Sequence, residues 1–296
     1  MSATARCPFG VAYHPPRRRS RPPPAGTLSD EWGTSIVADD TYVRVVPGKV
    51  AEVVIQRPEV RNILNTPTVR QLTEAFRQLA ADRATQAILL YGAGDRAFCA
   101  GADLREVLDA RGTDAARAYF GGLADLFELM GRVPQPIVAA VRGHALGGGC
   151  GLAVAADVTI AADDAVFGLP EVRVGLFPMV VLGPILRSVA RKQVVEMAFT
   201  GGSLPAAAAR EAGFCSRVVP AAALLDEARA IANAIASQSP AVLSLGKTGL
   251  RGTDAMPMGP QLGYLRDLSA MVAMLEDSRE GMTAFLEKRP PAWRGA

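Results

Sequence analysis

The chain has 296 residues, of which 49% are hydrophobic and 21% are charged. This composition is ample for a large buried core and predicts a globular, soluble protein. No apolar run approaches the roughly 20 residues that a bilayer span requires, and residues 1–30 lack the apolar stretch of a secretory signal, so we expect a cytoplasmic protein without a membrane partner.

The first part of the chain is basic and rich in proline. The formal net charge is +3, yet residues 1–29 contain no acidic residue and five arginines, which are Arg6, Arg17, Arg18, Arg19 and Arg21. Five prolines between positions 15 and 24 oppose packing, so we expect residues 1–38 to be a disordered N-terminal extension. Nucleic-acid binding through this extension is the weaker alternative, because charge is present without an aromatic stacking platform. We therefore expect no nucleic-acid partner.

Beyond the extension, short apolar segments alternate with segments of helical periodicity. Strands are expected at residues 50–55, 87–91, 136–141 and 158–161, and helices from residue 66 and at 115–130 and 148–156. For the first helix, Thr66 is expected to be the N-cap and Pro67 the first helical residue. The strands are apolar throughout, as expected when helices cover both faces of a sheet. Past residue 220 the apolar spacing is helical, so the predicted architecture is an α/β core over 39–220 and a helical lobe over 221–296.

Two turns in the predicted core are rich in glycine and alanine. Gly147, Gly148 and Gly149 lie between a strand and a helix, where unpaired backbone N–H groups favour an anion. No Gly-Lys-Ser/Thr follows, so the turn is not a P-loop. A second turn at residues 98–104 also follows a strand. Two such turns could aim two N–H groups at one oxygen and stabilise the charge that develops on a thioester.

Five segments in this order resemble the crotonase (enoyl-CoA hydratase/isomerase) family, and they are residues 61–65, 98–104, 136–151, 167–171 and 279–289. The resemblance extends over residues 40–296 and implies a crotonase-like ββα spiral core. It also implies a helical C-terminal lobe that takes part in trimerisation and contacts coenzyme A. The expected substrate is an acyl-CoA thioester, the expected assembly is a homotrimer or hexamer, and no further cofactor and no metal site are expected.

The resemblance also assigns roles to individual residues. It places the two oxyanion donors on the backbone of Ala102 and Gly148 and the acid/base group on Glu171. The acyl-CoA site is expected to include Ala100, Asp103, Leu104 and Arg105. The last two residues so assigned, Phe285 and Lys288, are expected to reach the coenzyme A of a neighbouring subunit.

One exchange within these motifs affects the chemistry. In the two-acid hydratases of the family a glutamate follows the Gly-Gly-Gly-Cys run, but here Gly151 stands at that position. Glu171 precedes apolar residues, and burial should raise its pKa and let it exchange protons near neutral pH. Hydration of a 2-enoyl-CoA uses two such groups, whereas isomerisation of a 3-enoyl-CoA to a 2-enoyl-CoA needs one carboxylate. Monofunctional isomerases of the family also resemble this pattern.

Three alternatives stay open at this point. Hydration could use a water in the space left at Gly151, activated by Glu171 or by a side chain of the helix that carries Tyr119, Asp125 and Glu128, although Tyr119 and Asp125 are expected on the helix surface. The protein could instead be a catalytically weak acyl-CoA-binding protein. The larger apolar residues at 175–179 could shape a pocket for a bulky acyl group or simply belong to the core.

Overall fold

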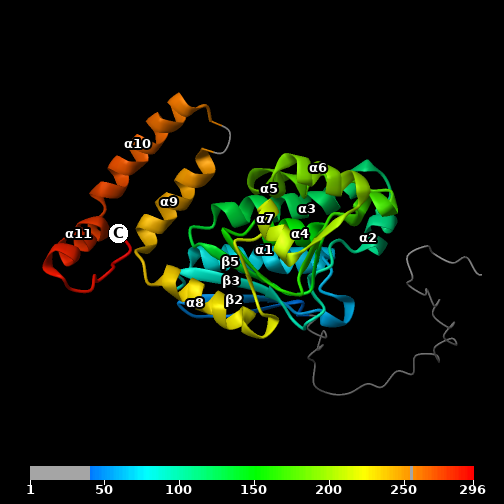
Figure 1. Cartoon of the computed structure of the whole chain (residues 1–296), viewed down its shortest axis with the longest axis horizontal. Helices are drawn as coiled ribbons and strands as arrows, with labels where there is room; N and C mark the ends of the chain where they lie inside the picture. Colours follow the sequence, from blue (N-terminus) through cyan, green and yellow to red (C-terminus); the bar gives the residue numbers. More distant parts are fainter. Residues whose placement is uncertain (1–40, 254–255) are drawn as a thin grey trace, which may run out of the picture. The chain divides into compact units, whose positions relative to one another are not determined.

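The structure is a computed structural model that describes residues 41–253 and 256–296, and within them a six-stranded sheet has the order β1-β2-β3-β5-β7-β10 (Figure 1). Its strands are β1 (Val43–Val46), β2 (Val50–Ile55), β3 (Ala87–Gly92), β5 (Ile137–Val141), β7 (Val158–Ala162) and β10 (Arg217–Val219). β1 is antiparallel to β2, and every other neighbouring pair is parallel. The predicted N-terminal extension at 1–38 lies outside the described residues.

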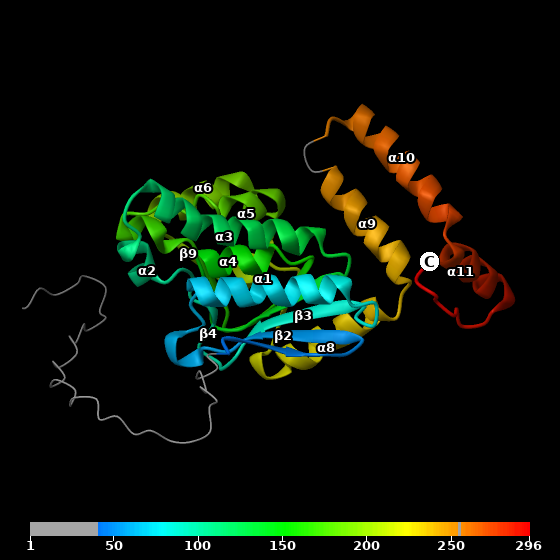
Figure 2. The same cartoon turned by 180° about the vertical axis from the view of Figure 1, so that it is seen from behind.

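Helices cover both faces of this sheet, because alternate residues of a strand point to opposite faces. Leu90 and Ala139 belong to one core, which they form with α1 (Thr66–Ala81), α3 (Thr113–Arg132) and α4 (Gly148–Val154). Leu89 and Val138 belong to a second core with α8 (Leu224–Ala236). Figure 2 shows α1 and α3 on one side of the strands and α8 on the other. The expectation that helices cover both faces of these apolar strands is confirmed.

A second sheet brings the predicted turns to one edge. Its strands are β4 (Ala97–Cys99), β6 (His144–Leu146), β8 (Val166–Gly168) and β9 (Ser203–Pro205), in that order. β4, β6 and β8 run parallel, and each follows a strand of the first sheet in the chain. The carboxyl ends of parallel strands meet at one edge, so the segments after β4, β6 and β8 become neighbours. These segments contain Ala102, Gly148 and Glu171.

The remaining elements connect the strands or form the C-terminal region. They are η1 (Pro58–Val60), α2 (Leu104–Asp109), η2 (Pro170–Val174), α5 (Leu182–Ser188), α6 (Arg191–Thr200), α7 (Ala206–Ala212), η3 (Ala221–Ala223), α9 (Pro240–Gly252), α10 (Met258–Met274) and α11 (Glu276–Glu287). The α/β class with a helical C-terminal region is thus confirmed. The boundaries at 39–220 and 221–296 stay predictions, and α8 packs on the sheet, whereas α9, α10 and α11 contact one another. Among the described helices, none has the length and apolar character to cross a bilayer.

A buried lysine attaches α9 to the α/β core. Lys247 is 6% exposed, and its Nζ donates to the carbonyl oxygens of Met130 and Gln135, both at 3.1 Å. It also pairs with Asp157 Oδ2 at 2.7 Å, and the same oxygen accepts the N–H of Ile137. The ammonium therefore joins α9 to the end of α3 and to the start of β5.

A buried carboxylate holds the last residues of the chain against α11. Asp277 is fully buried and accepts hydrogen bonds from Ser239 Oγ at 2.6 Å and from the N–H groups of Arg294 and Gly295. Burial by itself raises the pKa of Asp277, but these hydrogen bonds together bring it below its ordinary value. Trp293 Nε1 donates to the backbone carbonyl oxygen of Ser237 at 2.8 Å. The C-terminal segment is thereby tied to the junction of α8 and α9.

The start of α1 differs from the prediction. Asn65, not Thr66, is the N-cap: its side chain accepts the N–H of Thr68 at 3.0 Å, and Thr66 is the first helical residue. The reason is local, because Asn65 has extended backbone angles and asparagine is among the best N-cap residues. Thr66 instead donates both its N–H and its hydroxyl to Glu106.

Candidate active site

The backbone N–H of Ala102 is directed away from its partner segment. Leu64 N–H donates to Gly101 O at 2.8 Å, and Asp103 N–H donates to Leu64 O at 3.2 Å, which makes a parallel bridge between Leu64 and Ala102. In such a bridge the middle residue, Ala102, turns its own N–H to the other side. Gly148 is the first residue of α4, so its N–H has no intrahelical acceptor. Neither N–H has a hydrogen-bond acceptor in the part of the chain that the structure describes.

The two N–H groups belong to turns that touch. A Cβ added to Gly101 would lie 2.7 Å from Leu146 O and 3.5 Å from Gly148 N, and one added to Gly148 would lie 3.9 Å from Ala102 N. Gly101 has φ +93°, which a residue with a side chain rarely adopts. Glycine at 101 and 148 therefore permits the close approach that places both donors at one site, in agreement with the predicted oxyanion hole.

Glu171 lies against the same glycine turn. It is in the first turn of η2, which follows β8, and a Cβ on Gly147 would be 2.8 Å from Glu171 Oε1. Its Oε2 is buried without a hydrogen-bond partner among the described residues. Burial raises the pKa of Glu171 above its ordinary value. The arrangement provides a carboxyl group that lies against the glycine turn preceding α4, and its Oε2 is not occupied by a competing polar side chain among the described residues.

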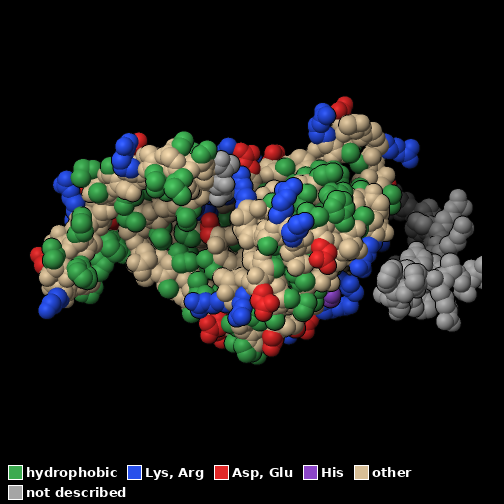
Figure 3. Space-filling model, turned by 45° about the horizontal axis from the view of Figure 1, so that its top comes forward, with side chains coloured by type: hydrophobic (Ala, Val, Ile, Leu, Met, Phe, Trp, Pro, Cys, Tyr) green, Lys and Arg blue, Asp and Glu red, His purple; other side chains and the backbone are tan. Residues whose placement is uncertain are grey.

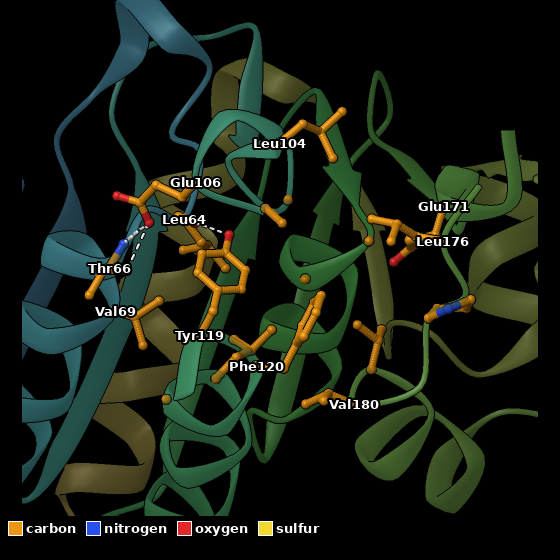
Figure 4. Close-up of a pocket in the computed structure, with 18 of the residues that line it drawn as sticks. Leu64, Thr66, Val69, Leu104, Glu106, Tyr119, Phe120, Glu171, Leu176 and Val180 are labelled. Atoms are coloured by element: carbon orange, nitrogen blue, oxygen red, sulfur yellow. Dashed lines mark hydrogen bonds between the residues drawn. The ribbon is translucent and has the colours of Figure 1, made fainter. Parts of the chain in front are cut away.

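These groups share one pocket of about 1160 Å³. Ala100, Ala102, Leu104, Gly148 and Glu171 line it together. Figure 4 shows Glu171 and Leu176 on one wall and Leu64 and Tyr119 on the opposite wall. Much of the remaining surface is apolar and comes from Val69, Phe120, Leu123, Leu176, Phe177 and Met179. The segment 175–179 thus contributes to the pocket, which supports the first of its two interpretations.

Tyr119 is a site residue that the sequence prediction placed wrongly on the helix surface. It is half-buried, and its hydroxyl donates to Leu64 O and accepts the N–H of Asp103, both at 3.1 Å. These two hydrogen bonds hold the Leu64–Ala102 bridge in place, and the bridge orients the N–H of Ala102. Burial raises the pKa of Tyr119 to about 12, so it is a poor base near neutral pH. Asp125 is exposed, as expected, although it also lines the pocket.

The space beside Gly151 is filled by apolar side chains. A Cβ at Gly151 would lie 2.8 Å from Cζ of Phe127 and 3.1 Å from Cγ1 of Val181. Both side chains are buried, and the Gly151 N–H donates to Gly147 O. A buried water needs polar partners and room, and this position offers neither. The expectation that a water could occupy the space at Gly151 is wrong, because Phe127 occupies it.

Four of the predicted contacts to coenzyme A lie outside the pocket lining. Asp103 accepts the N–H of Arg105 at 3.0 Å and so caps α2, while Arg105 itself is exposed. Phe285 is 82% exposed on α11, and Lys288 is exposed at its end. The roles of Asp103, Arg105, Phe285 and Lys288 in binding coenzyme A stay predictions.

An interaction that the sequence analysis missed joins α2 to α1 beside the pocket. Glu106 Oε2 accepts the N–H of Thr66 at 2.7 Å and its hydroxyl at 2.8 Å (Figure 4). The two residues are 40 positions apart, so no local pattern indicates the contact. No group of His, Cys, Asp and Glu side chains suited to a metal ion occurs within residues 41–253 and 256–296.

Comparison with known proteins agrees with this geometry. The enoyl-CoA hydratase/isomerase family model matches residues 46–296. The chain belongs to this family. A solved enoyl-CoA hydratase from Bacillus anthracis superposes with a TM-score of 0.82 at 30% identity and covers 86% of this chain and 100% of its own. The predicted crotonase-like fold is thereby confirmed.

Curated relatives in the family carry several names. A probable enoyl-CoA hydratase of Mycobacterium tuberculosis is 38% identical over 247 residues, which are 82% of this chain and 93% of the relative. The carnitinyl-CoA dehydratase of Proteus mirabilis is 36% identical over 84% of this chain and 96% of the relative. The 2,3-dehydroadipyl-CoA hydratase of Escherichia coli is 34% identical over 83% of this chain and 96% of the relative. The names agree on coenzyme A esters and differ in the acyl group.

Proposed function

We propose that this family member isomerises a 3-enoyl-CoA thioester to the 2-enoyl-CoA, with Glu171 as the single acid/base group. The observation that carries the proposal is the contrast between two positions. Glu171 lines the same pocket as Ala102 and Gly148, whereas the second glutamate is replaced by Gly151, and Phe127 fills the space beside it. One carboxylate is sufficient to carry a proton between two carbons on one face of the substrate.

The proposed reaction starts with the thioester oxygen between the N–H groups of Ala102 and Gly148. The Glu171 carboxylate takes a proton from C2, and the electron pair moves onto the thioester oxygen as an enolate, which the two N–H groups stabilise. The protonated Glu171 then gives the proton to C4, and the double bond forms between C2 and C3. The step consumes neither water nor a cofactor. Its donors are fixed by the Leu64 bridge and by the start of α4, so little reorganisation is needed.

Hydration of a 2-enoyl-CoA is the second candidate, and the names of the relatives favour it. Hydration would require Glu171 to activate the water and to protonate C2 in turn, or an exposed carboxylate such as Asp125 to take one of these roles. Against the two-acid form of this reaction, the atoms nearest a Cβ at Gly151 belong to Phe127 and Val181, which are apolar.

The deciding experiment compares two substrates in heavy water. Purified protein is incubated with 3-hexenoyl-CoA and with crotonyl-CoA, and products are followed by ultraviolet absorbance and mass. Isomerisation predicts new conjugated absorbance from 3-hexenoyl-CoA without added water. Loss of conjugation from crotonyl-CoA with one added water, at an equal or higher rate, would establish hydration instead. Micromolar binding without deuterium uptake at C2 would point to an acyl-CoA-binding protein.

We also propose that the chain forms a homotrimer or hexamer in which Phe285 and Lys288 reach the site of a neighbour. None of the 17 residues of α10 is buried. Figure 3 shows hydrophobic side chains over the C-terminal helices, and those more than half exposed include Leu250, Met258, Leu262, Met271, Met274, Met282, Phe285 and Leu286. An apolar surface of this extent supports a contact with another subunit.

A further inference from the structure

The ring that faces Gly151 comes from helix α3, which packs along α4. Gly148 and Gly151 are three residues apart and therefore share a face of α4. A Cβ on Gly148 would lie 3.3 Å from Leu123 Cδ2, and one on Gly151 would lie 2.8 Å from Phe127 Cζ. Leu123 and Phe127 are four residues apart on α3 and also share a face. Helix α3 thus lays one apolar side chain over each of the two glycines.

Phe127 and Val181 leave little exposed surface beside Gly151. Phe127 is 8% exposed and Val181 is 4% exposed, and both contact the position of a Cβ at Gly151. Val181 and Leu123 line the pocket, so the wall is continuous with the surface that the acyl group would meet. A Cβ closer than 3.0 Å to a ring carbon is not tolerated in a packed core, so even alanine at 151 requires the Phe127 ring to move.

From this packing we infer that Phe127, supported by Val181, determines which reaction the site performs. The inference rests on the proposed function and names the residue that excludes its alternative. The ring takes the volume in which a second carboxylate or a water would stand, and its apolar edge offers no hydrogen bond to either. With water kept from that side of the substrate, addition of water at C3 is suppressed, and the proton held by Glu171 can only return to carbon. Phe127 is therefore a specificity-determining residue.

The test replaces Gly151 and Phe127 together in one double variant. Gly151→Glu/Phe127→Ala places a carboxylate in the volume that the ring vacates. We expect the ratio of crotonyl-CoA hydration to 3-hexenoyl-CoA isomerisation to rise at least tenfold over wild type. The matched control is Gly151→Gln/Phe127→Ala, which has the same shape without an acid and should leave the ratio within threefold. Met130→Ala, on the same helix but buried in the core, controls for a loosened α3.

An unchanged ratio in the folded Gly151→Glu/Phe127→Ala protein would overturn the inference, and so would an equal rise in the glutamine control and in Met130→Ala. Should the double variants fail to fold, Phe127→Asn removes the ring carbon nearest Gly151 and offers a water hydrogen-bonding partners. Uptake of labelled oxygen from H₂¹⁸O into the 3-hydroxybutyryl-CoA formed from crotonyl-CoA should then exceed wild type, and no increase counts against the inference. Failure of the proposed function is seen separately, as wild-type protein that does not isomerise or as Glu171→Gln with full activity.

Discussion

At the scale of single residues, the chemistry depends on a carboxyl group that the fold leaves poorly solvated. Glu171 Oε2 is buried without a partner among the described residues, and a buried polar atom without a hydrogen bond lowers the stability of the fold. The proposed acid/base residue therefore also lowers the stability of the protein.

The substitution Glu171→Gln should separate activity from stability. Without a carboxylate the rate of proton exchange at C2 should fall about 10²- to 10⁴-fold, the usual contribution of general acid/base catalysis. The melting temperature at pH 7 should rise, because an amide in this position avoids the desolvation of a charge. Isotope exchange and calorimetry check the two effects, and retained activity would refute the role of Glu171.

The pH dependence follows from the raised pKa of Glu171. Since the folded state holds this proton more tightly than the unfolded state, where the pKa is near 4.5, ionisation of Glu171 destabilises the fold as pH rises through the folded-state pKa. The stability advantage of Glu171→Gln should therefore be small at pH 4 and grow toward pH 7. The rate of proton abstraction should rise over the same range, with a midpoint above 4.5. Paired pH profiles of melting temperature and rate test this, and parallel melting curves would contradict it.

Gly147 is the second residue whose substitution is informative. Gly147→Ala should lower kcat at least tenfold, because the new Cβ would lie 2.8 Å from Glu171 Oε1 and would displace the carboxylate. It should also cost about 1–2 kcal/mol of unfolding free energy, because its φ is +53°. Gly121→Ala is the matched control: no atom lies within 4 Å of its Cβ position in α3, and a gain of about 0.5–1 kcal/mol is expected. Denaturant unfolding and steady-state kinetics measure both.

At the scale of elements, long-range contacts determine how the helices attach to the sheet. Lys247 pairs with Asp157 and donates to the carbonyl oxygens of Met130, near the end of α3, and of Gln135, before β5. Its pKa is lowered by burial, which the nearby Asp157 partly offsets. Because Asp157 also accepts the N–H of Ile137 at the start of β5, one cluster links α9, α3 and the central sheet.

Removal of this ammonium should loosen α9 before the rest of the fold. Lys247→Met removes the cation that pairs with Asp157 and the donor to two carbonyl oxygens, and a loss of about 3 kcal/mol is expected for breaking a buried pair. Hydrogen exchange should accelerate in α9 more than in α1. The control Lys192→Met, at an exposed position of α6, should stay within about 0.5 kcal/mol of wild type. Equal effects of the two substitutions would show that the cluster is not an anchor.

At the scale of the whole molecule, the described chain has a site but leaves a large apolar surface uncovered. On α10, Leu265 and Leu268 face Gly249 of α9. Met271 and Met274, further along the same helix, are 55% and 67% exposed. Burial of such side chains by a second copy would stabilise the proposed oligomer.

Charges on this surface should disrupt the assembly. Met271→Lys/Met274→Lys should lower the mass measured by light scattering to that of a smaller species, because desolvating two ammonium groups opposes association. If α11 completes a neighbour's site, KM for the coenzyme A ester should rise about tenfold. Val45→Lys, on the edge strand β1, should change neither. A monomeric wild type, or an unchanged mass in the double variant, would refute the proposal.

Much of the fold follows from sequence patterns that act locally. The strand at Val50–Ile55 was predicted with its observed ends, and the helices around Thr113–Arg132 and Leu224–Ala236 follow from apolar spacing. The strands β4, β6 and β8 have three residues each, too few for periodicity to reveal a second sheet. The family resemblance nevertheless named Ala102, Gly148 and Glu171, and all three line one pocket.

The family and the class of fold follow from the sequence alone, because they depend on residue types in short motifs, while the catalytic roles of Ala102, Gly148 and Glu171 stay predictions. What lies beside Gly151 could be seen only in the tertiary structure. A glycine in the sequence indicates free space, and the packing of α3 shows that Phe127 fills this space. The tertiary structure likewise revealed Tyr119 behind Ala102, Glu106 at the start of α1 and Lys247 beneath α9. Each of these contacts joins residues far apart in the chain, and no local pattern specifies where such side chains meet.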